Sequence, residues 1–242
     1  MKPIRHVESP VFVLTSVRSG STMLRLMLDT HSQICAPHEL HLNRVRVHME
    51  TPFAKLAMDM AALDTEELEY MLWDSVLHRE LVRSGKPTIV DKTPQHALGW
   101  QRLLNGWPDA RFVFLLRHPY SIAGSLRAAH PTDEPSVWDA NAVEFVDSIA
   151  AARRNINGHT LRYEELTADP EAVLTGLCGF LGLEFEPAML RYGDVSRAPL
   201  RPGLGDWRPK VQSGRVQTSA PVPELPDASP ELVDAAATWG YA

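Results

Sequence analysis

Short apolar runs alternate along the chain with longer stretches in which apolar residues recur at helical spacing. The short runs are rich in β-branched and aromatic residues, and they predict buried strands at 11–15, 34–36, 88–90, 111–116 and 159–162. The longer stretches predict a helix after the loop 16–22, and further helices over 64–84, 119–129, 136–155 and 170–181. Because strands alternate with helices, we expect an α/β fold of three layers, with a central parallel sheet of about five strands and helices on both faces.

The helix that begins at Asp64 has the clearest local signals. Asp64 is a good N-cap, Glu67 completes a capping box three residues later, and Gly85 ends the helix. Residues 43–62 before it predict a weaker helix that Pro52 interrupts. The spacing of apolar residues in the stronger helix predicts a buried stripe formed by Leu68, Met71, Leu72, Val76 and Leu81.

Composition changes near the C-terminus, where seven of the 19 prolines lie within the last 44 residues. We therefore expect one α/β domain over 1–198, and a proline-rich segment over 199–242 that packs on this domain or trails from it.

Charge and cysteine content narrow the function classes. The formal net charge of −6 argues against a nucleic-acid-binding protein, which needs a basic face. Two cysteines, Cys35 and Cys178, give no disulfide framework and suit a reducing compartment. The apolar run at 11–14 is too short for a signal peptide, and no run approaches a membrane span. We expect a soluble, cytoplasmic protein.

The loop between the first strand and the first helix has the chemistry of an anion site. Gly20 lets the backbone approach a ligand closely, and Ser19, Ser21 and Thr22 add hydroxyl donors. Arg18 adds a planar fork of charged donors, and the helix that follows directs the positive end of its dipole to the same point. The loop predicts a phosphate site; the alternative is a strand-to-helix turn that binds nothing.

This loop is P-loop-like but is not a Walker A motif, because Ser21 rather than Lys follows Gly20. A Walker B aspartate is also missing from the best apolar strand, which ends at Arg117, and Asp91 is followed by Lys92. These features disfavour a magnesium-dependent kinase, which stays open as an alternative.

A second anion site is predicted at the end of the strand 111–116. Arg117 follows this strand, and Ser125 lies eight residues later, two turns into the next helix. Both side chains can reach a phosphate at the strand end. The alternative is that Arg117 pairs with a carboxylate and that Ser125 bonds to its own helix backbone.

Two residues near strand ends could take part in catalysis. Glu39 could accept a proton from a hydroxyl beside the anion site, and His38 and His41 flank it as other candidate bases. Lys92 could stabilise charge on a transferred group. The alternatives are a solvated acid for Glu39 and, for Lys92, a surface lysine with Asp91 as its partner.

Together these motifs resemble the sulfotransferases that use 3′-phosphoadenosine 5′-phosphosulfate (PAPS). Residues 18–22 are similar to the 5′-phosphosulfate loop of that family, and 111–119 with Ser125 are similar to its 3′-phosphate motif. Residues 161–183 resemble the strand and helix that follow, so the resemblance covers roughly 10–190. Guanidinium, ammonium and backbone N–H donors would then replace magnesium, because a sulfuryl group carries less charge than a phosphoryl group.

The resemblance implies a role for each matching position. The residues that would bind PAPS are Arg18, Ser19, Gly20, Ser21, Thr22, Arg117, Ser125 and Tyr163. Glu39 matches the catalytic base, and Lys92 and Arg18 match the residues that support the transition state, with no metal. The arginine loop, with a glutamate 21 residues after Arg18, is similar to tyrosylprotein sulfotransferases and to bacterial sulfotransferases of natural-product pathways.

The sequence departs from the family pattern at two positions and in one C-terminal motif. Val17 stands where a proline is common, and His118 replaces a frequent Asp or Asn. A recognisable C-terminal basic motif is absent, which leaves Arg208, Lys210 and Arg215 as candidate nucleotide contacts.

The sequence thus predicts a PAPS-dependent sulfotransferase that acts on the hydroxyl of a small, largely apolar acceptor, free or tethered to a carrier protein. The acceptor pocket is expected within 40–85 and 125–145, where Phe53, Trp73, Trp138 and Phe145 either line it or form helix core. The alternatives are a P-loop-type kinase that uses ATP and magnesium, and a non-catalytic nucleotide-binding module.

Overall fold

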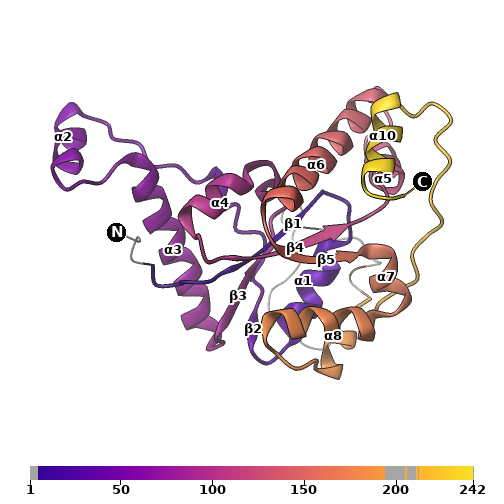
Figure 1. Ribbon diagram of the computed structural model, residues 1–242, viewed down its shortest axis with the longest axis horizontal. Coiled ribbons are helices and arrows are strands. Elements are labelled where there is room, and N and C mark those ends of the chain that lie inside the picture. The colour runs from indigo at the N-terminus through magenta and orange to yellow at the C-terminus, as the bar shows by residue number, and fades with distance from the viewer. Residues whose placement is uncertain (1–4, 194–204, 206–210, 212, 242) are drawn as a thin grey trace.

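Five parallel strands form one sheet in the computed structural model, which describes residues 5–193, 205, 211 and 213–241 (Figure 1). The strands are β1 (Val11–Thr15), β2 (Ile34–Cys35), β3 (Thr88–Asp91), β4 (Arg111–Leu116) and β5 (Gly158–Arg162), and their order in the sheet is β2-β3-β1-β4-β5. The predicted three-layer α/β fold with five parallel strands is confirmed.

Strand β1 is the centre of the sheet because it is wholly buried and pairs on both sides. It pairs with β4 from Val11↔Arg111 to Thr15↔Leu115, and with β3 at Val11↔Val90. The chain leaves β1 toward β2 and later crosses to β4 on the other side. Open α/β sheets bind ligands at the carboxyl ends of the strands where the order reverses in this way, so the loop after β1 has a favourable position.

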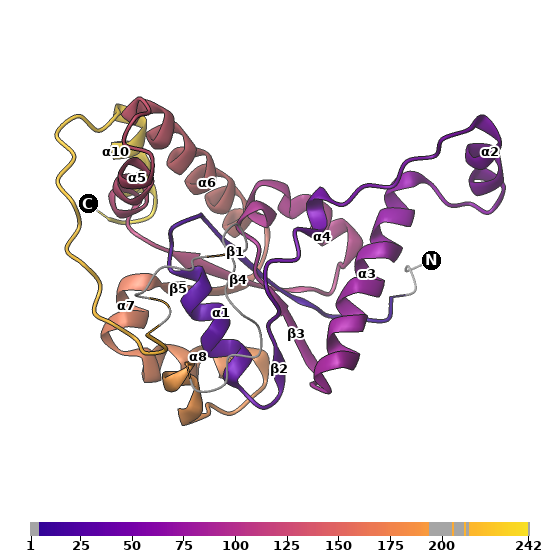
Figure 2. The same cartoon turned by 180° about the vertical axis from the view of Figure 1, so that it is seen from behind.

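Helices lie on both sides of the sheet (Figure 2), and alternate residues of the strands divide the core between its two faces. Val11 and Val13 point to the layer that contains α1 (Ser21–Thr30), α7 (Tyr163–Ala168), α8 (Pro170–Leu181) and the 3₁₀ helix η3 (Pro187–Arg191). Phe12 and Leu14 point to the opposite layer. That layer contains α3 (Thr65–Ser84), η2 (Pro94–Gly99), α4 (Trp100–Gly106), α5 (Pro119–Ala129), α6 (Pro135–Asn155) and α10 (Pro230–Thr238).

Helix α3 has the predicted cap and end, but the predicted apolar stripe is wrong in part. The Asp64 side chain accepts from the Glu67 N–H, and Gly85 ends the helix in the left-handed conformation. The buried side chains are Tyr70, Trp73 and Leu77. Val76 and Leu81 pack against this core as predicted. Met71 and Leu72 are exposed, because the large aromatic residues, which bury more area, decide which side of the helix faces the core.

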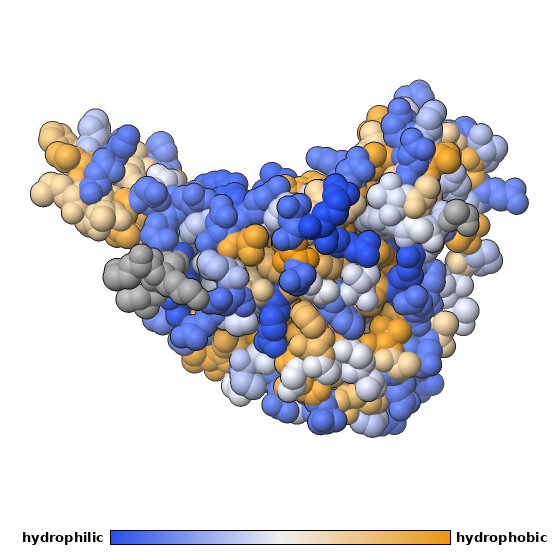
Figure 3. All heavy atoms as spheres, in the orientation of Figure 1, coloured by the Kyte–Doolittle hydropathy of each residue, from blue (hydrophilic) through white to orange (hydrophobic). Residues whose placement is uncertain are grey.

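Residues 42–64 differ from the predicted weak helix. They form a short 3₁₀ helix, η1 (Leu42–Arg44), and a separate helix, α2 (Pro52–Met60), joined by an extended segment. Pro52 begins α2 rather than interrupting it, since proline is tolerated in a first helical turn and Thr51 provides the N-cap. Helix α2 projects from the body and displays apolar side chains at its surface, including Phe53 and Met60 (Figures 1 and 3).

Several helices were not predicted, namely η2, α4, α7 and α10. Residues 213–229 run as an extended segment along the surface, and α10 then packs on α5 and α6 (Figure 1). Ser229 caps α10 and Pro230 occupies its first turn, a signal that the high proline content of the segment obscured. Among the described helices, none combines the length and the apolar character that a membrane span requires.

Candidate functional site

A cavity of about 550 Å³ opens at the carboxyl edge of the sheet. Its walls come from the loop after β1, the start of α1, the segment after β2, and residues near the ends of β3, β4 and β5. The predicted site residues that line it are Arg18, Gly20, Ser21, Thr22, Glu39, Arg117, Ser125 and Tyr163. The structure therefore brings together residues from four separate motifs of the sequence.

The loop after β1 has a constrained backbone that turns the start of α1 toward the cavity. Arg18 has φ 61° and Gly20 has φ 83°, both in the left-handed region. Such a conformation is costly for a residue other than glycine, and it concentrates at functional sites. Gly20 precedes α1 without a side-chain cap, so the N-terminal N–H groups and the dipole of this helix are directed into the cavity.

The hydroxyl of Ser19 does not face the cavity. It is fully buried, lies 2.5 Å from Oγ1 of Thr15, and donates to the carbonyl of Ser16 at 2.8 Å. These hydrogen bonds close the loop on itself, and the role of Ser19 as a ligand donor stays a prediction. Ser21 and Thr22 line the cavity at the start of α1, as predicted.

The two predicted anion sites are contiguous. The Arg117 guanidinium donates to the carbonyl of Arg18 at 2.6 Å and lies 4.6 Å from the centroid of the Tyr163 ring. Nε of Arg18 donates to the Ser125 hydroxyl at 3.1 Å. Both arginines, which follow different strands, therefore line one cavity, an arrangement that suits a ligand with more than one anionic group.

Glu39 is a largely buried carboxylate on the wall of the same cavity, with 7% of its surface exposed. Its Oε1 accepts from the ammonium of Lys92, and its Oε2 lies 3.4 Å from Nε2 of His41. His41 also lines the cavity, whereas His38 is exposed and its ring faces the backbone carbonyl of Glu39. The structure therefore places His41, and not His38, beside the carboxylate.

Lys92 lies behind Glu39 and is 1% exposed, so the surface-lysine alternative is wrong. Burial lowers the pKa of Lys92, while the Glu39 carboxylate opposes this shift. Asp91 does not pair with Lys92 but bonds to the His96 ring at 2.8 Å and accepts from the Thr93 hydroxyl at 3.2 Å. Lys92 therefore pairs with Glu39 rather than with Asp91.

A second wall of the cavity comes from residues after η3, where the sequence indicated Arg215 as a candidate contact but not Tyr192 or Gln217. Tyr192, Arg215 and Gln217 line this wall. Tyr192 donates from its hydroxyl to the Arg215 carbonyl at 3.1 Å, and the Gly193 N–H donates to the Gly214 carbonyl at 3.1 Å. These long-range contacts hold Arg215 beside Tyr192 at the cavity. The other two C-terminal candidates, Arg208 and Lys210, lie outside the described residues.

The aromatic residues proposed for the acceptor pocket lie elsewhere. Trp73 and Phe145 are buried in the core, as the alternative interpretation held. Trp138 stacks on the His130 ring, and Phe53 is exposed on α2. Apolar atoms reach the cavity instead from Val17, Met23, Pro94, Tyr192 and Val211.

This fold and this cavity define an α/β protein with a glycine-containing loop at the carboxyl edge of its sheet. Comparison with known proteins specifies the class further, because a model of the sulfotransferase family matches residues 10–187. The chain belongs to this family.

Relatives with assigned names agree with this membership. Nodulation protein NoeE of Sinorhizobium fredii is 26% identical over 221 residues, which cover 77% of this chain and 52% of NoeE. Protein-tyrosine sulfotransferase 1 of Danio rerio is 23% identical and covers 79% of this chain and 58% of its own length. Stf3 of Mycobacterium tuberculosis, an omega-hydroxy-beta-dihydromenaquinone-9 sulfotransferase, is 27% identical over 150 residues, 53% of this chain and 38% of Stf3. The chain thus spans about half the length of the curated relatives it matches.

Two solved structures share the fold over nearly the whole chain. The sulfotransferase domain from the curacin biosynthetic pathway has a TM-score of 0.68 at 23% identity, covering 98% of this chain and 99% of that domain. The sulfotransferase domain of the Synechococcus PCC 7002 olefin synthase has a TM-score of 0.67 at 22% identity, covering 100% and 98%.

Proposed function

We propose that this protein transfers the sulfuryl group of PAPS to the hydroxyl of a largely apolar acceptor. The observation that carries the proposal is that a buried carboxylate, Glu39, lies in the same cavity as Arg117 and the loop 18–22, called the anion loop from here on. An anion site alone would serve a binding module, whereas a carboxylate beside it supplies a base for a hydroxyl nucleophile. This pairing favours a transferase over the non-catalytic alternative.

The residues of the cavity fit a nucleotide that carries phosphates at two positions. The backbone of the loop 18–22 and the start of α1 would hold the 5′-phosphosulfate. Arg117 and Ser125 would hold the 3′-phosphate, and Tyr163, which packs against Gly20 and Arg117, would lie near the nucleotide. This donor would supply the sulfuryl group for the reaction.

Glu39 would accept the proton of the acceptor hydroxyl as the acceptor oxygen attacks sulfur in line. The new S–O bond forms while the bond from sulfur to the 5′-phosphate oxygen breaks, and the 3′,5′-bisphosphate leaves with the bonding electrons. Arg18 and Lys92 would stabilise the charge that develops on the leaving oxygen. Lys92 also holds Glu39 in place, because its ammonium donates directly to Oε1.

The acceptor class follows from the apolar part of the lining and from the relatives. Val17, Met23, Pro94 and Val211 give apolar surface to the cavity that Glu39 also lines. The name of Stf3 specifies a hydroxylated menaquinone as its acceptor. The two solved domains come from the curacin biosynthetic pathway and from an olefin synthase. We propose a lipid-like, polyketide-like or phenolic hydroxyl, either free or held on a carrier protein.

Transfer is tested directly by incubating the protein with PAPS and, separately, 2-naphthol or 1-decanol, and by following adenosine 3′,5′-bisphosphate and the sulfate ester. The proposal predicts both products with at least one acceptor, and a large loss of turnover in Glu39→Gln without loss of nucleotide affinity. Product formation from ATP and magnesium, with none from PAPS, would instead support the kinase alternative. An unchanged rate in Glu39→Gln would shift the base role to His41.

A further inference from the structure

The peptide groups of Ala36 are held from both sides by helix α1. The Ala36 N–H donates to Oδ1 of Asp29 at 3.0 Å, and the Ala36 carbonyl accepts from Nη1 of Arg25 at 3.0 Å. Arg25 and Asp29 are four residues apart, so they lie on one face of the helix. They form a side-chain clamp on a backbone segment that ends three residues later at Glu39.

The clamp is built from charged groups that are costly to bury. Arg25 is only 5% exposed, and burial lowers its pKa, while the carboxylates of Asp29 and Glu39 raise it. A guanidinium in such a place needs carboxylate partners and hydrogen bonds to offset its desolvation. Its two acidic neighbours are Asp29, which forms the other half of the clamp, and Glu39, at the end of the clamped segment.

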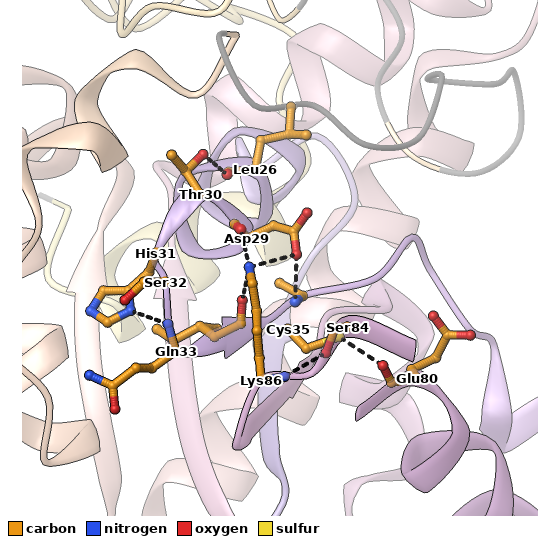
Figure 4. Close-up of polar contacts among 12 residues, drawn as sticks. Leu26, Asp29, Thr30, His31, Ser32, Gln33, Cys35, Glu80, Ser84 and Lys86 are labelled. Atoms are coloured by element: carbon orange, nitrogen blue, oxygen red, sulfur yellow. Dashed lines mark hydrogen bonds and ion pairs between the residues drawn. The ribbon is translucent and has the colours of Figure 1, made fainter. Parts of the chain in front are cut away.

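Lys86 holds the start of the segment that leads to Glu39, where α1 ends and β2 begins (Figure 4). Its ammonium lies 3.8 Å from Oδ1 of Asp29 and donates to the carbonyls of Asp29 at 2.6 Å and Ile34 at 2.7 Å. Strand β2 is thus tied to the end of α1 before the chain reaches Ala36. The path from β2 to Glu39 is therefore defined by α1 rather than by sheet pairing, because β2 is only two residues long.

The first turn of α1 reaches the same point in the cavity as Glu39. A Cβ built on Gly205 would lie 3.0 Å from Oγ1 of Thr22 and 3.6 Å from Oε1 of Glu39, so both side chains face one position. Thr22, Arg25 and Asp29 follow one another at spacings of three and four residues along the helix. One helix therefore carries both the anion loop and the clamp.

We propose that Arg25 and Asp29 are positioning residues that fix Glu39 relative to the anion loop through the Ala36 peptide groups. The inference rests on the proposed function, in which Glu39 is the base. It assigns to α1 a second task besides anion binding: to set the distance between the base and the bound donor.

The test compares Arg25→Met and Asp29→Ala, which each remove one half of the clamp, with a matched control, Arg111→Met. Arg111 is half-buried and also donates to a backbone carbonyl, that of Leu181 at 2.9 Å, but it lies at the opposite end of β4 from the cavity. Three readings are taken: turnover with PAPS and 2-naphthol, affinity for adenosine 3′,5′-bisphosphate, and hydrogen exchange of peptides that span 34–40. The last reading needs no acceptor.

The clamp variants are expected to lose about 100-fold in kcat, the scale of a misplacement near 1 Å, with little change in nucleotide affinity. Their exchange should rise in 34–40 and not in 16–22, Arg25→Lys should recover part of the rate, and Arg111→Met should behave as wild type. The double variant Arg25→Met/Glu39→Gln should have nearly the same kcat as Glu39→Gln alone, because both substitutions act through one carboxylate.

Unchanged exchange and turnover in Arg25→Met would overturn the clamp. If Glu39→Gln is slow but the losses of kcat in Arg25→Met and Glu39→Gln add fully in the double variant, the clamp is also overturned, and the proposed function stays intact. A wild-type rate in Glu39→Gln would instead remove the base role from the proposed function, and the positioning role with it.

Discussion

The aromatic ring of Tyr163 lies so close to Cα of Gly20 that a Cβ on Gly20 would overlap ring atoms Cδ2 and Cε2. Tyr163 opens α7, directly after β5, and its ring also contacts the Arg117 guanidinium. The anion loop, the second anion site and the end of β5 are therefore packed around one ring, which links three strand ends at the cavity.

Gly20→Ala should displace Tyr163 and disturb both anion sites. We expect nucleotide affinity to fall by about ten-fold or more, equivalent to about 1.4 kcal/mol. The control is Gly182→Ala, since Gly182 has a similar φ of 73° but no atom within 4 Å of a built Cβ. Both variants should lose about 1–2 kcal/mol of stability from the left-handed backbone. Calorimetric titration with adenosine 3′,5′-bisphosphate separates them, and equal affinities would refute the packing argument.

Gly214→Ala should move Arg215 and Gln217 out of the cavity wall. A Cβ on Gly193 would lie 2.6 Å from Cα of Gly214, so the two backbones approach too closely for a side chain at either position. Gly85→Ala is the control, because Gly85 has nearly the same φ, 67° against 69°, in open space. Weaker bisphosphate binding in Gly214→Ala alone is the expected result. Similar binding in both variants would show that this wall contributes nothing to the nucleotide site.

His118 should make the fold less stable in mild acid. Its Nδ1 accepts the Tyr120 N–H at 3.2 Å, and burial lowers the pKa of His118, with Glu164 opposing. An unfolded histidine titrates near about 6.5. Between that value and the lower pKa in the native state, the unfolded chain binds a proton that the native chain does not. Stability is therefore lost as the pH falls from about 6.5 through the native pKa.

The variant His118→Asn keeps a capping side chain that does not titrate. Its urea midpoint should fall less than that of the wild type between pH 8 and pH 5.5. His159, whose pKa is also lowered by burial, is present in both proteins, so the difference isolates His118. Identical pH dependence in the two proteins would contradict the assignment.

Much of the fold could be predicted because the strands are short, apolar and regularly separated by helices. The anion loop and Glu39 were also accessible, since residue type and position relative to a strand indicate their chemistry. The buried face of α3 was accessible only in part, because Leu72 and Tyr70 both fit helical periodicity and only packing selects Tyr70. The sequence also does not show that the hydroxyl of Ser19 closes the loop on Thr15.

Contacts between residues far apart in the chain also could not be predicted from the sequence. Arg215 reaches the cavity through the Gly193 and Gly214 contact, which joins residues 21 positions apart. The Arg25 and Asp29 clamp is similarly invisible, because a buried arginine on an amphipathic helix resembles any solvated charge in the sequence. Pairing of Lys92 with Glu39 required the relative placement of β2 and β3.

The central claim is that the cavity recognises a nucleotide with separate 5′ and 3′ phosphates. The most direct measurement is calorimetric titration of the wild type and Arg117→Ala with adenosine 3′,5′-bisphosphate and with AMP, which lacks only the 3′-phosphate. The account predicts that the wild type prefers the bisphosphate by at least about ten-fold. Arg117→Ala should lose about 1.5–3 kcal/mol of bisphosphate affinity, typical of hydrogen bonds to charged groups, and with it the preference. Equal wild-type affinities for the two nucleotides, or bisphosphate binding unaffected by Arg117→Ala, would contradict it.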